Sequence, residues 1–229
     1  PGRPEDNWLA ESFAEYAGGL ATGYVIEKAH VDPRDVISFK QLVEVWRSKG
    51  TMVGERGTIA GANLLAGFEA GEYRYLLLYH QGPLVVHMLR TLVGDQRFTT
   101  ICRRLLALAD NGPVTTDDLQ SITSEVVGQD MTWFFDDWVR HAGPARVKID
   151  RELVDQDGKP VLRVRLRQDA GHAFHRLYLP LVLEYSGGRR EVRLAFQERP
   201  TQEFTFPLTT RPLKVTVDPA HNNFAEYDE

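Results

Sequence analysis

Residues 7–16 have the sequence NWLAESFAEY, in which large apolar and aromatic side chains surround a carboxylate at position 11. We expect a helix that places four of these side chains around Glu11, namely Trp8, Leu9, Phe13 and Tyr16. A carboxylate among apolar neighbours needs a partner, a proton or a metal ion. Glu15 lies four residues further on, on the same side of the helix. Periodicity alone favours the simpler interpretation, in which Glu11 is a solvated helix charge.

Apolar residues keep helical spacing from this stretch to about His141. We predict four further helices, which glycine, proline and threonine residues begin or end. The first carries an apolar stripe from Leu84 to Leu92 and ends at Gly94; the second runs from Phe98 to Leu108; the third begins at Thr115 or Thr116 and ends at Gly128; a short fourth carries Trp133, Phe134 and Trp138.

The second part of the chain alternates apolar and polar residues in short runs from about Val147 onward. In the clearest run, leucine and valine at positions 162, 164 and 166 share one face of a half-buried strand, and arginines at 163, 165 and 167 share the other. The same alternation returns over residues 192–196, 204–206 and 213–217. We therefore predict an α+β chain, with a helical domain over residues 1–144 and a small antiparallel β-sandwich over residues 145–229.

The overall composition narrows the classes of function. The 229 residues carry 27 basic and 32 acidic side chains, a formal net charge of −5, without a Lys- or Arg-rich block. This balance argues against nucleic acid or anionic lipid as a partner. The single cysteine, Cys102, excludes an internal disulfide, and no run approaches the roughly 20 apolar residues of a membrane segment. Because the chain starts with Pro1 rather than Met, we expect a piece of a longer polypeptide.

Residues 8–16, WLAESFAEY, resemble the W-L-x-E-G-F-A-x-Y segment of the gluzincin zinc aminopeptidases, the family of aminopeptidase N and leukotriene hydrolase. The resemblance implies that Glu11 is the third ligand of a catalytic zinc ion. The other two ligands in that family are histidines of an H-E-x-x-H helix, which would lie upstream of residue 1 here. All seven histidines of this chain follow Glu11, and none begins such a motif.

Two further segments resemble the same family, in the same order. Residues 79–82, YHQG, are similar to its Y-x-K-G segment, which implies that Tyr79 is the catalytic tyrosine. Residues 131–138, MTWFFDDW, resemble the D-L-S-W-F-F-D-Q-W segment near the end of its catalytic domain. The resemblance implies the helical half of a thermolysin-like catalytic domain, followed by an immunoglobulin-like sandwich that includes residues 179–181 and 217–219.

Three departures from the family pattern stand out. Ser12 occupies the position of a usual Gly, and Gln81 occupies that of a usual Lys, which removes a cation near Tyr79. The large helical module that ends the longer members is absent, from which we expect a short, bacterial-type member. The compartment, bacterial cytoplasm or periplasm, stays open because no secretion signal is visible.

The resemblance implies a parent enzyme that hydrolyses N-terminal residues from peptides. Zinc would polarise the scissile carbonyl and acidify a bound water, and Tyr79 would donate a hydrogen bond to the developing oxyanion. The partners are then a peptide substrate and the upstream part of the same polypeptide. Because catalytic zinc sites use three protein ligands, we predict that residues 1–229 alone are inactive. An alternative stays open, in which the protein kept the fold without the metal site and serves as a scaffold or peptide-binding module.

Two other groups of residues could suggest ligand sites. We interpret His172 and His175 as exposed histidines rather than a metal pair, because positions i and i+3 of a strand face opposite ways. Gly54, Gly57 and Gly61 are interpreted as a loop or close helix contact, since no Gly-Lys-Ser/Thr sequence follows them.

The remaining signals have structural interpretations. Aromatic residues at helical spacing, here Trp133, Phe134 and Trp138, are predicted to be core. The arginines within residues 163–167 are predicted to face water or to pair with acidic neighbours. Cys102 is predicted to be a buried, unreactive thiol.

Overall fold

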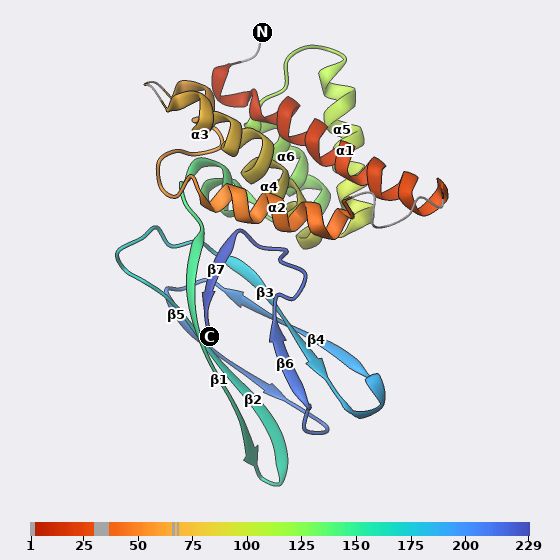
Figure 1. Cartoon of the computed structure of the whole chain (residues 1–229), viewed down its shortest axis with the longest axis vertical. Coiled ribbons are helices and arrows are strands. Elements are labelled where there is room, and N and C mark those ends of the chain that lie inside the picture. Colours follow the sequence, from red (N-terminus) through yellow and green to blue (C-terminus); the bar gives the residue numbers. More distant parts are fainter. Residues whose placement is uncertain (1–2, 30–36, 66, 68) are drawn as a thin grey trace. The chain divides into compact units, whose positions relative to one another are not determined.

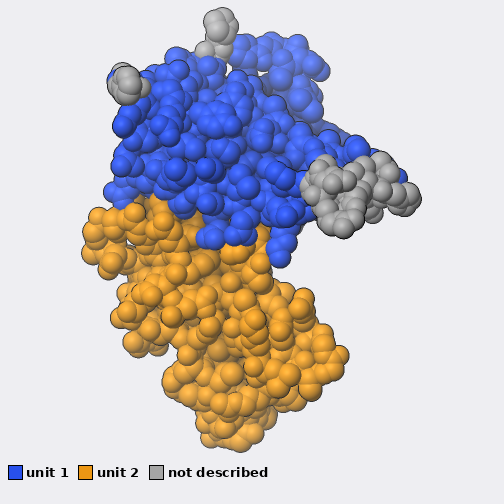
Figure 2. All heavy atoms as spheres, viewed as in Figure 1, with its two compact units in different colours: residues 1–143 blue, residues 144–229 orange. Residues whose placement is uncertain are grey.

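The computed structural model describes residues 3–29, 37–65, 67 and 69–229. The chain divides into two compact units, residues 1–143 and residues 144–229, which are coloured separately in Figure 2. The first unit is helical and the second is built from β-strands (Figure 1). The fold is therefore α+β, which confirms the predicted fold class. No helix within the described ranges is long and apolar enough to cross a membrane.

Two helices of the first unit begin at residues with clear capping roles, and one of them also ends at such a residue. Ser38 and Thr115 each accept a hydrogen bond from the main-chain N–H three residues on, and the side chain of that third residue accepts one in return. Gly128 ends its helix in the left-handed region, at a φ of 77°. The α-helices are α1 Trp8–Ala29, α2 Phe39–Thr51, α3 Ala70–Leu76, α4 Gly82–Val93, α5 Asp95–Ala109, α6 Thr116–Val127 and α7 Thr132–Phe135.

Aromatic rings from three helices form much of the core of this unit. The ring of Tyr16, on α1, lies 5.8 Å from the rings of Phe39 and Trp46 on α2, measured between centroids, and 6.0 Å from that of Phe98 on α5. Tyr16 and Trp46 are almost completely buried. Because each large ring removes much apolar surface from water, this cluster fixes α1 against its neighbours.

A π-helical turn, η3 (Leu77–Gln81), joins α3 and α4 into one continuous helical segment. The main-chain N–H of Gly82 reaches back five residues to the carbonyl of Leu77. One extra residue in this turn changes the direction of the side chains that follow it, and such turns are frequent at functional sites. Tyr79 lies in the middle of the turn, which helical periodicity in the sequence did not predict.

The second unit is a sandwich of two sheets, with strand orders β5-β2-β1-β7 and β4-β3-β6. All pairs are antiparallel except β1 with β7, where Ala145 pairs with Ala225 in parallel. The predicted antiparallel sandwich is thus correct apart from this one pair, which brings the last strand back beside the first. The strands are β1 Ala145–Gln156, β2 Lys159–Gln168, β3 Leu177–Glu184, β4 Arg190–Gln197, β5 Thr201–Pro207, β6 Lys214–Val217 and β7 Ala225–Asp228.

The alternation of β2 has the predicted orientation. Leu162, Val164 and Leu166 are buried in the sandwich, and the intervening arginines are on the other face. Each arginine is paired with a carboxylate on a neighbouring strand: Arg163 with Glu152, Arg165 with Glu203 and Arg167 with Asp150. The charges on this face are therefore balanced within the sheet.

On β4 the larger apolar side chains of the alternating pattern face outward, and not into the sandwich as the pattern predicts. Val192 and Leu194 are 55% and 59% exposed, whereas Ala195 and Gln197 are buried. The cause is the register with β3, in which Leu177 pairs with Gln197 and the residues of a pair share one face. Four buried leucines fix the inner face of β3, at positions 177, 179, 181 and 183, and their partners on β4 must face inward with them.

Candidate active site

Tyr79 and Glu11 are 68 positions apart in the sequence and meet in the first unit. The Tyr79 hydroxyl donates a hydrogen bond to Glu11 Oε2 across 2.5 Å. Glu11 belongs to the first turn of α1, and Tyr79 belongs to the π-turn η3. Both side chains are half-buried, so each retains some access to solvent. The structure thus places side by side the two residues that the sequence resemblance singled out.

A second hydrogen bond lies directly beside the first. The hydroxyl of Ser12 donates to the main-chain carbonyl of Leu78 across 2.8 Å, and both residues are buried. Consecutive residues of α1 are therefore bonded to consecutive residues of η3. In the sequence Ser12 stands out only as a departure from a family pattern, and no sequence signal pairs it with Leu78.

The neighbours of Tyr79 include a second tyrosine and a histidine. The ring of Tyr75 stacks on that of Tyr79, with centroids 5.2 Å apart, and also meets the ring of His80 edge-on at 5.3 Å. Because residues four positions apart are neighbours on a helix, the spacing of Tyr75 and Tyr79 could have predicted this contact from the sequence.

Electrostatics favour the neutral forms of the two titratable side chains that follow one another in η3. The hydrogen bond to Glu11 raises the pKa of Tyr79 above its usual value, and partial burial and the nearby carboxylate charges of Glu11 and Glu15 act in the same direction. Burial lowers the pKa of His80, and the charge of Glu15 opposes that shift. Tyr79 is thereby kept as a hydrogen-bond donor around neutral pH.

Gln81 faces the interior of the unit. It is 1% exposed and packs against Gly50 of α2, where a Cβ on that glycine would lie 3.3 Å from the Cα of Gln81. A neutral amide can be buried here at a lower desolvation cost than an ammonium group. The departure from the usual lysine is therefore compatible with the packing of η3 on α2.

Glu11 can supply one ligand to a zinc ion, because carboxylate oxygen is among the donors that zinc accepts. Within the described part of the chain, no group of three His, Cys, Asp or Glu side chains is placed to hold a metal ion. The donor set of the described residues therefore fits one position of a catalytic zinc site, and further ligands would have to come from elsewhere.

The interpretation of His175 as an exposed residue was wrong, whereas His172 is exposed. His175 is 1% exposed. Its main-chain N–H and carbonyl can be buried because both bond to the side-chain amide of Gln168, at 3.1 and 2.7 Å. The same amide donates to the buried Gln197 across 3.0 Å. A hydrogen-bonded polar cluster inside the sandwich thus takes the place of an apolar contact.

The remaining predictions concern the aromatic residues before position 139, the glycine-rich stretch and the single cysteine. Phe134 and Trp138 are buried core residues as predicted, while Trp133 is half-buried. The glycine-rich stretch contains a turn with Gly54 in the left-handed region, at a φ of 58°. Cys102 is a free thiol that is half-buried rather than fully buried, and burial raises its pKa.

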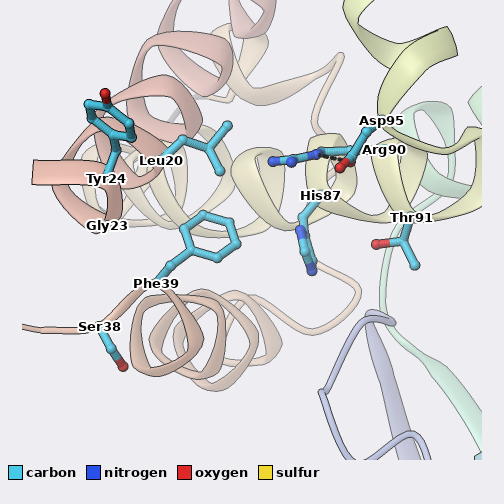
Figure 3. Close-up of a pocket in the computed structure, with 9 residues that line it drawn as sticks. All are labelled: Leu20, Gly23, Tyr24, Ser38, Phe39, His87, Arg90, Thr91 and Asp95. Atoms are coloured by element: carbon cyan, nitrogen blue, oxygen red, sulfur yellow. Dashed lines mark hydrogen bonds and ion pairs between the residues drawn. The ribbon is translucent and has the colours of Figure 1, made fainter. Parts of the chain in front are cut away.

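A hollow of about 570 Å³ lies elsewhere in the first unit, between residues of α1, α2, α4 and α5 (Figure 3). Within it, Arg90 Nε donates to Asp95 Oδ1 across 2.7 Å and a second Arg90 nitrogen donates to the Tyr16 hydroxyl across 3.3 Å. The hydroxyl of Tyr16 also lies 3.2 Å from Nδ1 of His87. These bonds tie α4 to the start of α5 and to α1, and no pattern in the sequence indicated them.

A helical unit with a paired tyrosine and glutamate is followed in the chain by a β-sandwich. The crystal structure of Legionella pneumophila aminopeptidase A in complex with aspartic acid superposes on 99% of this chain, with a TM-score of 0.74 and 15% sequence identity. The chain spans 24% of the length of that protein. No curated protein gave a match.

The family follows from the first unit. The domain model of peptidase family M1 matches residues 4–138, which is more than half of the chain. The chain belongs to peptidase family M1. The matched range includes both Glu11 and Tyr79.

Proposed function

We propose that the chain is part of a zinc-dependent aminopeptidase that removes N-terminal residues from peptides, with Glu11 as a zinc ligand and Tyr79 as a catalytic hydrogen-bond donor. The observation that carries the proposal is the 2.5 Å hydrogen bond between the Tyr79 hydroxyl and Glu11 Oε2. The bond joins a phenol donor to a carboxylate, the two groups that the proposal requires at one site. Membership of peptidase family M1 supports the same class of reaction.

In this proposal the carboxylate of Glu11 would supply one anionic oxygen ligand. Bound zinc polarises a carbonyl and acidifies a water molecule, and this is the chemistry that peptide hydrolysis needs. Glu11 is half-buried on α1, with Trp8 almost fully buried one turn away. A carboxylate in such surroundings gains from pairing with a cation.

The role of Tyr79 would be to stabilise negative charge on the substrate. Its hydroxyl keeps its proton at neutral pH, because the usual tyrosine pKa is about 10 and the Glu11 contact raises it further. A donor fixed near a developing oxyanion lowers the barrier, and loss of one such donor costs about 10² in rate. The π-turn and the stacked ring of Tyr75 restrict where the Tyr79 hydroxyl can lie.

The remaining zinc ligands would come from an upstream portion of the same polypeptide. The helix that carries Glu11 exposes a row of small residues, against which another helix could pack closely: Ala10, Ala14, Ala17, Gly18 and Ala21. On this basis residues 1–229 alone should bind no tight zinc. Stoichiometric zinc that survives a weak chelator in the purified 229-residue chain, and that Glu11→Ala removes, would contradict this part of the proposal.

The decisive experiment measures release of amino acid from an aminoacyl-amide by the full-length parent, with and without a chelator. We expect chelator-sensitive turnover that Glu11→Ala abolishes and Tyr79→Phe slows about 10²-fold. Tyr73→Phe is a matched control, because the Tyr73 hydroxyl bonds to Glu69 across 2.6 Å on the exposed side of α3. No turnover across a broad substrate panel, together with no bound zinc, would favour a scaffold or peptide-binding module instead.

A further inference from the structure

Two hydrogen bonds join α1 to the π-turn η3 at adjacent positions. Glu11 accepts from Tyr79 at the edge of the unit, and Ser12 donates to the carbonyl of Leu78 in its interior. The outer bond links the two side chains of the proposed catalytic site. The inner bond involves a main-chain atom, so it fixes the position of the turn itself.

The carbonyl of Leu78 needs a donor from outside its own helix. The N–H of Gly82 bonds to Leu77, one residue earlier, because of the π-turn. In the same π-helical pattern, the carbonyl of Leu78 would accept from the N–H of the residue five positions on. That residue is Pro83, which has no N–H. The hydroxyl of Ser12, at 2.8 Å, supplies the hydrogen bond that this buried carbonyl requires.

The contact also leaves little freedom for an alternative arrangement. Ser12 is 0% exposed, so solvent does not replace its hydroxyl without a rearrangement. A Cβ on Gly82 would lie 1.9 Å from the Ser12 Oγ and 2.7 Å from its Cβ. The two helical segments are therefore in close contact at Ser12 and Gly82, next in the chain to Glu11 and close to Tyr79.

We propose that Ser12 is a positioning residue, whose bond to Leu78 holds the π-turn in the place where the Tyr79 hydroxyl reaches Glu11. Ser12 does not touch substrate or metal, and it acts only through the backbone of η3. Its effect on catalysis rests on the proposed function, whereas its effect on the position of Tyr79 does not.

The structural test uses the 229-residue chain with 3-fluorotyrosine in place of tyrosine, observed by ¹⁹F NMR. Tyr79→Phe assigns the Tyr79 signal, and Glu11→Ala shows where that signal lies when its partner is lost. We expect Ser12→Ala to move the Tyr79 signal toward the Glu11→Ala position. Ser12→Cys, which keeps a weaker donor of similar size, should move it less and also covers the case in which Ser12→Ala fails to fold.

Ser124→Ala is the matched control. The Ser124 hydroxyl also donates to a main-chain carbonyl, that of Gln120 at 2.9 Å, but on α6 and away from η3. It should leave the Tyr79 signal unchanged even if it lowers the melting temperature. A Tyr79 signal that is identical in the wild type and in every folded Ser12 variant overturns the proposal.

The catalytic test uses the full-length parent. Ser12→Ala should lower kcat by about ten- to a hundredfold, with KM and zinc content unchanged, because misplacement of a catalytic group has effects of this size. If Glu11→Ala and Tyr79→Phe abolish or slow turnover while Ser12→Ala does not, the positioning role is wrong and the proposed function stands. If none of the three changes turnover, the proposed function fails, and the ¹⁹F result still decides the structural role of Ser12.

Discussion

The Tyr79 hydroxyl lies 2.5 Å from Glu11 Oε2, so a phenol of the π-turn donates directly to a carboxylate of α1. A short O–H···O⁻ bond of this kind is stronger than a bond between neutral groups. It joins two residues that are half-buried and far apart in the sequence. Consequently, a change at either residue should be detectable at the other.

The first prediction concerns the titration of Tyr79. Glu11→Ala should lower the pKa of Tyr79 toward its usual value of about 10, because it removes both the hydrogen bond and the carboxylate charge that raise it. The stabilisation from this contact is present below that usual pKa and is lost as pH rises through the raised value in the folded chain. NMR of ¹³Cζ-labelled tyrosine would measure the pKa of Tyr79. Glu69→Ala is the control, which should lower the pKa of Tyr73 and leave that of Tyr79 unchanged. An unchanged Tyr79 titration in Glu11→Ala would count against the contact.

The second prediction concerns Gly82. In most helices Gly→Ala stabilises by up to about 1 kcal/mol, but Gly82→Ala should destabilise the chain by roughly 1–2 kcal/mol, because the new Cβ would overlap Ser12. Gly18→Ala, at an open position of α1, should be neutral or stabilising. Urea denaturation of both variants measures the difference. Equal behaviour of the two would show that α1 and η3 are not in close contact.

The third prediction concerns a buried carboxylate at the start of the helical unit. Asp6 Oδ1 accepts from the main-chain N–H of Thr116 at 2.7 Å and from its hydroxyl at 2.8 Å, at the first residue of α6. Asp6→Ala should lower the free energy of unfolding by about 1–3 kcal/mol, because buried donors lose their acceptor. Glu5→Ala, next to it and half-exposed, should change stability by less than about 0.5 kcal/mol. Similar losses in both variants would contradict the specific role of Asp6.

The fourth prediction concerns Cys102, the only cysteine in the chain. Burial raises the pKa of its thiol, and the charge of Arg90 opposes the shift only in part. Because the thiolate is the reactive form, alkylation by iodoacetamide at pH 8 should be slower in the folded chain than in the chain unfolded in guanidinium, and it should accelerate as pH rises. Equal alkylation rates in the folded and unfolded chain would show that burial does not protect the Cys102 thiol.

The fifth prediction tests the orientation of β4. Leu181→Ala on β3 should destabilise the chain by about 2–5 kcal/mol, since Leu181 is fully buried. Leu194→Ala removes the same atoms from a side chain that is 59% exposed, and it should change stability by about 0.5 kcal/mol or less. Thermal unfolding of the two variants compares them directly. A large loss in Leu194→Ala would mean that the side chain is covered.

Sequence patterns were reliable where one rule acted alone. The alternation over residues 162–166 gave the correct faces for β2, because a strand buried on one side has to alternate. The same rule had the wrong outcome for β4, where Val192 and Leu194 look like an inner face. The register with the leucines of β3 decided that face, and no local pattern contains it.

The position of His175 has a similar explanation. It lies in the irregular chain between β2 and β3, where the sequence predicted an exposed histidine. The residue is nevertheless buried, because the side chain of Gln168 satisfies its main-chain groups from seven residues away. Burial of a polar residue depends on a partner whose identity the local sequence does not specify.

By itself, the sequence determined the fold class, the helical and sandwich parts of the chain, and Glu11 and Tyr79 as candidate site residues. Only the tertiary structure decided that these two side chains share a hydrogen bond, that Ser12 bonds to the neighbouring carbonyl of Leu78, and which face of β4 is inward. The physical reason is that hydrophobic periodicity indicates the type of secondary structure and which side of a segment is buried. Which atoms meet depends on the register of strands, the extra residue of a π-turn and the close approach of helices, and these are properties of the packed chain.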